Sequence, residues 1–239
     1  IDQYMPNLKK ILDENPEYRT LITAPDGHIY SFPWIEELGS DKEAIQSIGG
    51  IPWINKAWLD ELGLEMPTTP EELTEVLRAF KQAHPDCLPL SFVMNGGNED
   101  VGVLLSAFGY GENADHYVVN NDKQVIYTLA DEGIIPGLEW LHTLYAEGLI
   151  DPEVFTQDYN TYVSKAASDR YGLFMAWDNT SAGTPDNYVA LPPLKNAEGE
   201  QAVTRQNAMG FEIGRCVITG TNPNPAPTTK WVDQLYDPI

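Results

Sequence analysis

The chain has 239 residues, of which 42% are hydrophobic, and its 36 acidic and 14 basic residues give a formal net charge of −22. This apolar content argues against global disorder, and the length suits one large domain or two small ones. Nucleic acid or an anionic membrane would be repelled by such a surface, so neither is expected as a partner.

The cysteines, the hydropathy and the chain ends further limit the classes of protein to which the chain can belong. Cys87 and Cys216 form no metal-type pair, and both a disulfide between them and free thiols stay open. No run approaches the roughly 18 apolar residues of a membrane span. Both ends read as the inside of a folded protein, so the chain is expected to be a piece of something longer.

The first predicted elements are short. A helix is predicted over Asn7–Asp13 and a strand over residues 27–33, GHIYSFP. A second short helix follows, with Asn55 as its N-cap and Gly63 as its stop.

A longer helix follows in TPEELTEVLRAFKQAHP. Thr69 is its expected N-cap, Pro70 occupies the first helical position, and Glu72 completes a capping box. The helix should end before Pro85. Its apolar face consists of Leu73, Val76, Leu77 and Phe80.

The middle of the chain combines a hairpin and a helix. Residues 117–129 read as a hairpin with its turn at Asn120–Lys123. The helix lies in PGLEWLHTLYAEGLIDP and ends at Gly148. Its apolar stripe consists of Leu138, Leu141 and Tyr145.

The last third alternates helices with single strands. Helices are expected at Tyr159–Ala167 and Thr229–Tyr236, and strands at residues 171–177, 187–194 and 215–219. Because helices and strands intermix along the whole chain, we predict an α/β fold.

Known catalytic motifs are missing from the sequence. There is no zinc-protease, serine-hydrolase, phosphate-loop or EF-hand motif, and the four histidines are far apart in sequence. The GxGxxA match beginning at Gly109 stands in the reverse of the dinucleotide-binding context. A carboxylate pair for glycoside hydrolysis stays open, because 36 acidic residues always offer a plausible pair.

Tryptophans beside small polar residues are the remaining signal. Trp34 follows YSFP, Trp53 lies in GGIPWIN, and Trp177 ends a predicted strand just before Asp178 and Asn179. A sugar binder needs flat aromatic faces with polar groups at their edges. We therefore expect the three indoles to stack on a sugar, with Asp178 as acceptor and Asn179 as donor for its hydroxyls. Core packing is the alternative for each tryptophan.

The loop NGGNED offers further polar groups. Asn95, Asn98 and Glu99 are proposed as contacts at the edge of a sugar. The alternative is a helix N-terminus rich in capping residues.

Several motifs, in the same order as in a known family, carry a resemblance. They are DGHIYSFP, INKAWLDELGLEMPTTPEELTEVLRAFK, LEWLHTLYAEGLIDPEVF, GLFMAW and VITGTNPNPAPTTKWVDQLYDP. The chain thereby resembles the sugar- and oligosaccharide-binding family of extracellular solute-binding proteins of ABC transporters, particularly the large lipoproteins of Gram-positive bacteria.

The resemblance implies a type II periplasmic-binding-protein-like fold, mostly the second lobe with parts of the first. Trp34 would then lie at the first crossing between lobes, and Phe211 would line the second. The implied division is residues 1–32 in the first lobe, 33–35 as a hinge crossing, 36–206 in the second lobe, 207–211 as a crossing and 212–239 in the first lobe.

The function implied is binding and delivery without catalysis. Two lobes close around a sugar or oligosaccharide, which is then passed to a membrane permease. The protein is expected to be a monomer without a cofactor, at the extracellular face of the membrane as a lipoprotein or in the periplasm. A secreted glycoside hydrolase and a non-transport receptor or scaffold module are the alternatives.

One departure from the family concerns metal. Many large members carry a calcium-type loop after the LRAFK helix, whereas this chain has QAHPDCLPLSF there. Only Asp86 remains as an oxygen ligand, so no metal is expected at this position.

Overall fold

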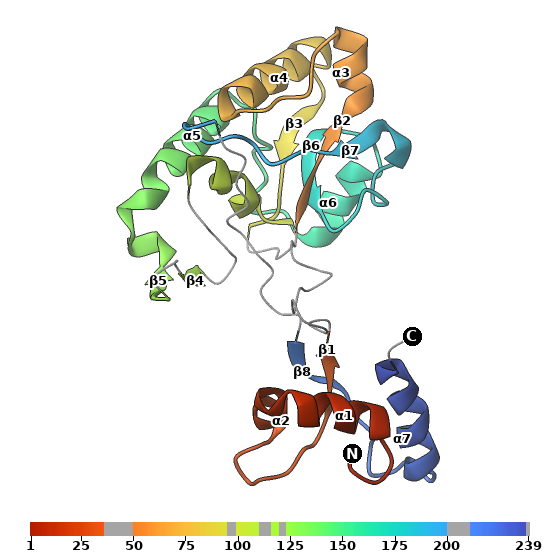
Figure 1. Ribbon diagram of the computed structural model, residues 1–239. Helices are drawn as coiled ribbons and strands as arrows, with labels where there is room; N and C mark the ends of the chain where they lie inside the picture. Colours follow the sequence, from red (N-terminus) through yellow and green to blue (C-terminus); the bar gives the residue numbers. More distant parts are fainter. Residues whose placement is uncertain (36–49, 95–98, 110–115, 120–122, 200–210, 238–239) are drawn as a thin grey trace. The chain divides into compact units, whose positions relative to one another are not determined.

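The computed structural model describes residues 1–35, 50–94, 99–109, 116–119, 123–199 and 211–237 (Figure 1). The chain forms two compact units, Ile1–Ser47 with Ala208–Ile239, and Ile48–Asn207. Within the described ranges, no helix combines the length and apolar content that crossing a bilayer requires. The lobe and hinge boundaries expected from the family stay a prediction.

The first unit is built on a two-stranded antiparallel ladder. Strand β1 (Phe32–Ile35) pairs with β8 (Phe211–Cys216), so that Trp34 faces Glu212 across the ladder. The helices of this unit are α1 (Pro6–Glu14), α2 (Pro16–Ile22), α7 (Pro225–Asp233) and the 3₁₀ turn η6 (Gln234–Tyr236).

A buried carboxylate joins the two ends of this unit. Asp233 accepts hydrogen bonds from the backbone N–H of Asn7 at 3.2 Å and of Leu8 at 3.0 Å. These are unpaired donors of the first turn of α1, so a residue of α7 caps a helix more than 200 positions earlier.

The second unit contains a four-stranded mixed sheet in the order β3-β6-β2-β7. Strand β3 runs parallel to β6, whereas β2 is antiparallel to both of its neighbours. The strands are β2 (Ile51–Asn55), β3 (Leu88–Ser91), β6 (Tyr171–Ala176) and β7 (Tyr188–Ala190).

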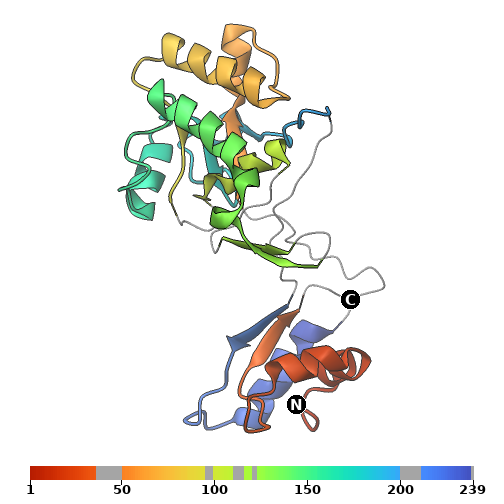
Figure 2. The same cartoon turned by 90° about the vertical axis from the view of Figure 1, so that its left-hand side faces the viewer.

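Helices cover both faces of this sheet, with α4 and α6 on opposite sides (Figures 1 and 2). On one face, a core joins Leu173 and Met175 of β6 to a first set of helices, which is given below. On the other face, a separate aromatic core joins Phe174 to Tyr162 of α6. The first set is α3 (Lys56–Leu62), α4 (Pro70–Ala83), α5 (Ile135–Ala146) and the 3₁₀ helix η2 (Val101–Phe108), and α6 spans Tyr159–Ala166.

Several local predictions are confirmed. The Thr69 hydroxyl accepts from the N–H of Glu72 at the start of α4, and Asn55 accepts from the N–H of Trp58 at the start of α3. The Glu72 carboxylate, however, accepts from the N–H and hydroxyl of Thr68, one residue before the N-cap. Gly63 adopts a left-handed φ of 66°, which suits a helix stop.

The predicted hairpin is also confirmed, by β4 (Tyr117–Val119) pairing with β5 (Val125–Tyr127). Most of its expected turn, Asn120–Lys123, lies outside the described residues. The remaining short elements are η3 (Thr128–Ala130), η4 (Glu132–Ile134) and η5 (Pro185–Asn187).

Five elements were assigned wrongly or incompletely from the sequence. The strand expected at residues 27–33 begins only at Phe32, and the one expected at residues 215–219 is the end of β8. Strands β2 and β3 were not predicted, because both contain a proline and neither shows a clear alternation of buried and exposed residues. Helix α2 was missed as well.

Only part of the apolar stripe of α5 faces the core. Leu141 packs against the core, whereas Leu138 and Tyr145 are exposed, and Gly137 and Leu144 are buried. The Gly137 position is crowded, since a Cβ there would lie 2.6 Å from a methyl carbon of Leu105. Close packing against η2 therefore selects the glycine face of the helix.

Candidate functional site

The candidate site lies where β3 and β6 end and β2 begins. Ser91, the last residue of β3, pairs with Phe174, and Ile51 at the start of β2 pairs with Ala176. Ligands of open α/β sheets bind outside the carboxyl ends of parallel strands. We call this region the strand-end edge and define it by the residues that follow the two strands, Phe92, Val93, Glu99, Trp177, Asp178 and Asn179.

Trp177 follows β6 directly and is 41% exposed. The residue before it is held by a second tryptophan, because the indole Nε1 of Trp53 donates to the carbonyl oxygen of Ala176 at 3.3 Å. Trp53 itself is half-buried and packs against the aromatic core. The two indoles thus have different surroundings, and Trp177 presents the more exposed ring.

The turn after Trp177 is organised by its own side chains. Asp178 Oδ1 accepts from the N–H of Thr180 at 2.9 Å and from its hydroxyl. The hydroxyl and then the N–H of Thr180 hold the pKa of Asp178 below its usual value, so the carboxylate is charged and can accept from a sugar hydroxyl. Asn179 Nδ2 donates to the carbonyls of Pro185 and Tyr188, which engages both of its N–H groups within the protein.

Glu99 closes the other side of the edge. Its carbonyl oxygen accepts from the N–H of Val93 at 3.0 Å. Partial burial raises the pKa of its carboxyl group above the usual 4.5. Such a shift is expected for a carboxyl group that lies partly against an apolar surface. The other two residues predicted from this loop, Asn95 and Asn98, lie outside the described residues.

Two predicted site residues belong to the other unit. Trp34 is 44% exposed, and the Arg215 guanidinium lies 5.6 Å from the centre of its ring. Phe211 is only 8% exposed and stacks on Tyr18 with ring centres 4.5 Å apart. Its burial favours a core role, whereas Trp34 keeps an exposed indole.

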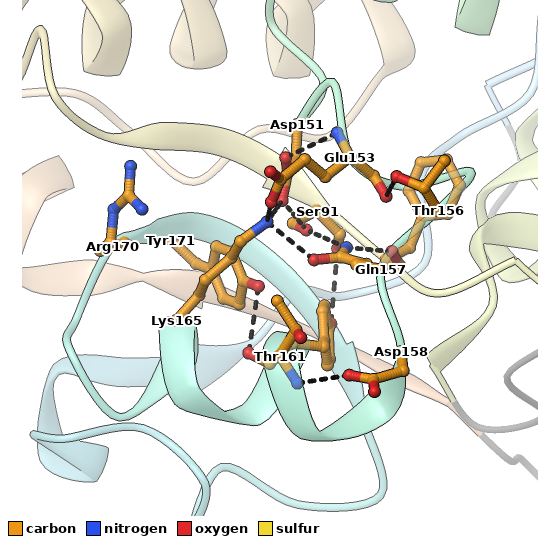
Figure 3. A network of polar contacts seen from close by, with 12 residues as sticks. Ser91, Asp151, Glu153, Thr156, Gln157, Asp158, Thr161, Lys165, Arg170 and Tyr171 are labelled. Atoms are coloured by element: carbon orange, nitrogen blue, oxygen red, sulfur yellow. Dashed lines mark hydrogen bonds and ion pairs between the residues drawn. The ribbon is translucent and has the colours of Figure 1, made fainter.

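A buried ion-pair network beside β3 escaped the sequence analysis (Figure 3). Lys165 Nζ contacts the Asp151 carboxylate at 2.7 Å, and their side chains are only 11% and 1% exposed. Ser91 donates to the same carboxylate at 2.9 Å. In the sequence, Asp151 belongs to the motif GLIDPE, but Lys165 lies 14 positions later, too far for a local pattern to pair them.

An apolar groove of about 400 Å³ also lies in this unit, between η2 and α5. Leu138, Leu141 and Tyr145 line it, together with Phe155. Asp100, His116 and His142 also line it, but its exposed lining is mainly apolar, whereas sugars need polar partners at the rim of an aromatic surface. The strand-end edge, which carries both kinds of group, is therefore the better carbohydrate site.

Candidate metal ligands and reactive thiols are few among the described residues. Over the described ranges, no three His, Cys, Asp or Glu side chains are grouped to hold a metal ion. Cys87 and Cys216 are free, and burial raises the pKa of the Cys87 thiol to about 11. The expected absence of metal and cofactor stays a prediction.

Comparison with known proteins identifies relatives for the whole chain, although no protein-family model matches. The chain is 48% identical over 246 aligned positions to the fructooligosaccharide ABC transporter substrate-binding protein FusA of Streptococcus pneumoniae serotype 4, which covers 100% of this chain and 46% of that protein. The chain thus spans about half the length of this relative.

Solved structures agree with the sequence comparison. FusA of S. pneumoniae in complex with kestose matches 100% of this chain and 50% of its own, with a TM-score of 0.82 at 48% identity. An HMO-binding, ABC-transporter-associated solute-binding protein from Bifidobacterium longum infantis matches 98% of this chain and 51% of its own, with a TM-score of 0.71 at 26% identity. The fold is α/β and type II periplasmic-binding-protein-like, as predicted.

Proposed function

We propose, on the premise that the chain belongs with the ABC transporter substrate-binding proteins it matches over its whole length, that it binds a sugar or oligosaccharide for delivery to a membrane permease. The observation that carries this proposal is the 48% identity to FusA along the entire chain. Because that relative is named for fructooligosaccharides, this is the ligand class to test first.

The chemistry of the strand-end edge supports the proposal. Trp177 supplies an exposed aromatic face, and Asp178 supplies a charged acceptor next to it. Glu99 adds a second carboxyl group at the neighbouring strand end. Such a site grips a sugar by its C–H face and its hydroxyls, and needs no nucleophile.

The finer parts of the proposal rest on the family. Trp34, Trp53, Asn95 and Asn98 remain proposed ligand contacts. The donor role expected of Asn179 is corrected, because both of its N–H groups already donate within the protein, so its amide oxygen is the proposed contact. The buried Phe211 is proposed to back the second crossing and not to touch the ligand. The proposal also includes closure of two lobes around the ligand, a monomeric state and docking on a permease. The protein would lie outside the cell membrane as a lipoprotein or in the periplasm.

Binding without turnover separates this function from hydrolysis. The full-length protein carrying this sequence should bind kestose in a calorimetric titration, with maltotriose as a matched trisaccharide control. A ligand at 100 times its Kd stabilises the folded state by about 2.7 kcal/mol, so a thermal shift should accompany binding. Mass spectrometry should find the kestose intact after incubation, whereas shorter products would support the hydrolase alternative. No heat and no thermal shift with a broad panel of sugars would refute the proposal.

A further inference from the structure

A charged side chain is oriented beside the end of β3 by three acceptors. Lys165 Nζ contacts Asp151 Oδ2 at 2.7 Å, Gln157 Oε1 at 2.8 Å and Glu153 Oε2 at 2.6 Å (Figure 3). An ammonium group donates only, so it must face the amide oxygen of Gln157. The contact with Lys165 therefore fixes which way the Gln157 amide points.

The amide nitrogen is thereby directed at the backbone where β3 ends. Gln157 Nε2 donates to the carbonyl oxygen of Phe92 at 2.8 Å and to the hydroxyl of Ser91 at 3.1 Å. The ladder between β3 and β6 stops at the Ser91–Phe174 pair. Gln157 thus holds the first residue beyond the ladder, in place of a neighbouring strand.

The next residue along the chain joins this contact to the strand-end edge. The N–H of Val93 donates to the carbonyl of Glu99 at 3.0 Å, and the Val93 side chain is buried with Ala176 in the aromatic core. A continuous path of bonds therefore runs from Lys165 through Gln157 and the Phe92–Val93 backbone to Glu99.

We propose that Gln157 is a positioning residue for the ligand site: its amide, oriented by Lys165, holds the Phe92–Val93 backbone that hydrogen-bonds to Glu99. The effect on sugar affinity rests on the proposed function, whereas the effect on the backbone does not. Gln157 itself lies before α6, and among the described residues its amide N–H groups bind the Phe92 carbonyl and the Ser91 hydroxyl.

The test is Gln157→Glu, which keeps the size of the side chain and its contact with Lys165. The new carboxylate oxygen replaces the N–H donor and faces the Phe92 carbonyl, so the bond to the backbone is lost. Gln82→Glu is the matched control, because it makes the same charge change at an exposed position of α4. Leu144→Ala, deep in the other core, controls for general loss of stability.

Hydrogen exchange without ligand gives the first readout. Gln157→Glu should speed exchange of the Val93 amide about tenfold relative to amides of β2, while Leu144→Ala speeds exchange across the unit and Gln82→Glu changes neither. The proposal would be overturned if Gln157→Glu left exchange of the Val93 amide unchanged, or sped it no more than exchange of the β2 amides. This outcome does not depend on whether the protein binds sugar.

Kestose titration well below the unfolding temperature gives the second readout. We expect about tenfold weaker binding for Gln157→Glu and unchanged binding for both controls. Equal losses for Gln157→Glu and Leu144→Ala would reduce Gln157 to a stability residue and overturn the proposal. A wild-type protein that binds no sugar would refute the proposed function, and hydrogen exchange would still decide the positioning role.

Discussion

The indole Nε1 of Trp53 donates a hydrogen bond to the carbonyl oxygen of Ala176, 3.3 Å away, where β6 ends. The residue that follows is Trp177, the more exposed of the two indoles. A tryptophan of one strand therefore anchors the backbone from which another tryptophan projects. This relationship assigns different parts to the two residues, although both were predicted as stacking surfaces.

Replacing Trp53 should separate anchoring from stacking. Trp53→Phe keeps an aromatic ring but removes the N–H, which should cost about 1 kcal/mol of folding stability and weaken kestose binding severalfold. Trp140→Phe is the control. The indole of Trp140 donates to the Thr74 hydroxyl, 3.0 Å away, and this contact does not involve the strand ends. Chemical denaturation and titration of both variants would test this. If Trp140→Phe weakened binding as much, Trp53 would have no special role.

Removing the exposed ring should have the larger effect on binding. Trp177→Ala should lower sugar affinity by about 2 kcal/mol, near 30-fold, because an aromatic face is lost while little core is disturbed. Trp231→Ala, at an exposed tryptophan of α7, should leave affinity unchanged. Unaltered affinity in Trp177→Ala would contradict the stacking proposal for this residue.

The pH dependence of stability should report on Glu99. Its pKa in the folded protein is raised above the usual 4.5 by partial burial, so the folded state binds more protons than the unfolded state over the window just above pH 4.5. The Glu99 contribution to stability is therefore present at lower pH and is lost as the pH rises through this window.

Glu99→Gln should consequently stabilise the protein more at pH 7 than at pH 4. Urea unfolding at both pH values measures the difference. The exposed Glu65→Gln provides a matched charge change in the same unit. An equal response of the two variants at both pH values would show that burial of Glu99 has no energetic consequence. At pH 7, Glu99→Gln should also weaken kestose binding if this carboxylate contacts the ligand.

The buried ion pair should matter far more than an exposed one. Lys165→Met leaves the Asp151 carboxylate, 1% exposed, without its counter-charge, and should cost about 3 kcal/mol of unfolding free energy. Lys56→Met breaks the exposed contact between Lys56 and Asp60 in α3 and should cost less than about 0.5 kcal/mol. Denaturant unfolding of the two variants measures both costs. Similar costs would mean that water reaches the Lys165 site.

Local signals made several helices of this protein predictable. Thr69 with Pro70, and Asn55 with Gly63, sit at helix ends where their own backbone needs a cap or a left-handed turn. Such signals act over three or four residues, so they can be read without the fold. The aromatic and other apolar residues before Trp177 equally predicted the strand that this residue follows, and with it the best candidate for a sugar-stacking ring.

The tertiary structure decided what lies next to each of these elements. The bond from Trp53 to Ala176 spans 123 positions, and the contact of Gln157 with Phe92 spans 65. Leu138 and Tyr145 of α5 are also exposed, because packing at Gly137 and Leu144 selected another side of the helix. Sequence alone therefore indicated the ends of those helices that carry a local cap or stop signal, and it offered candidate side chains for gripping a sugar. Which of them share an edge depended on strand order and packing, since those interactions join residues that no local pattern connects.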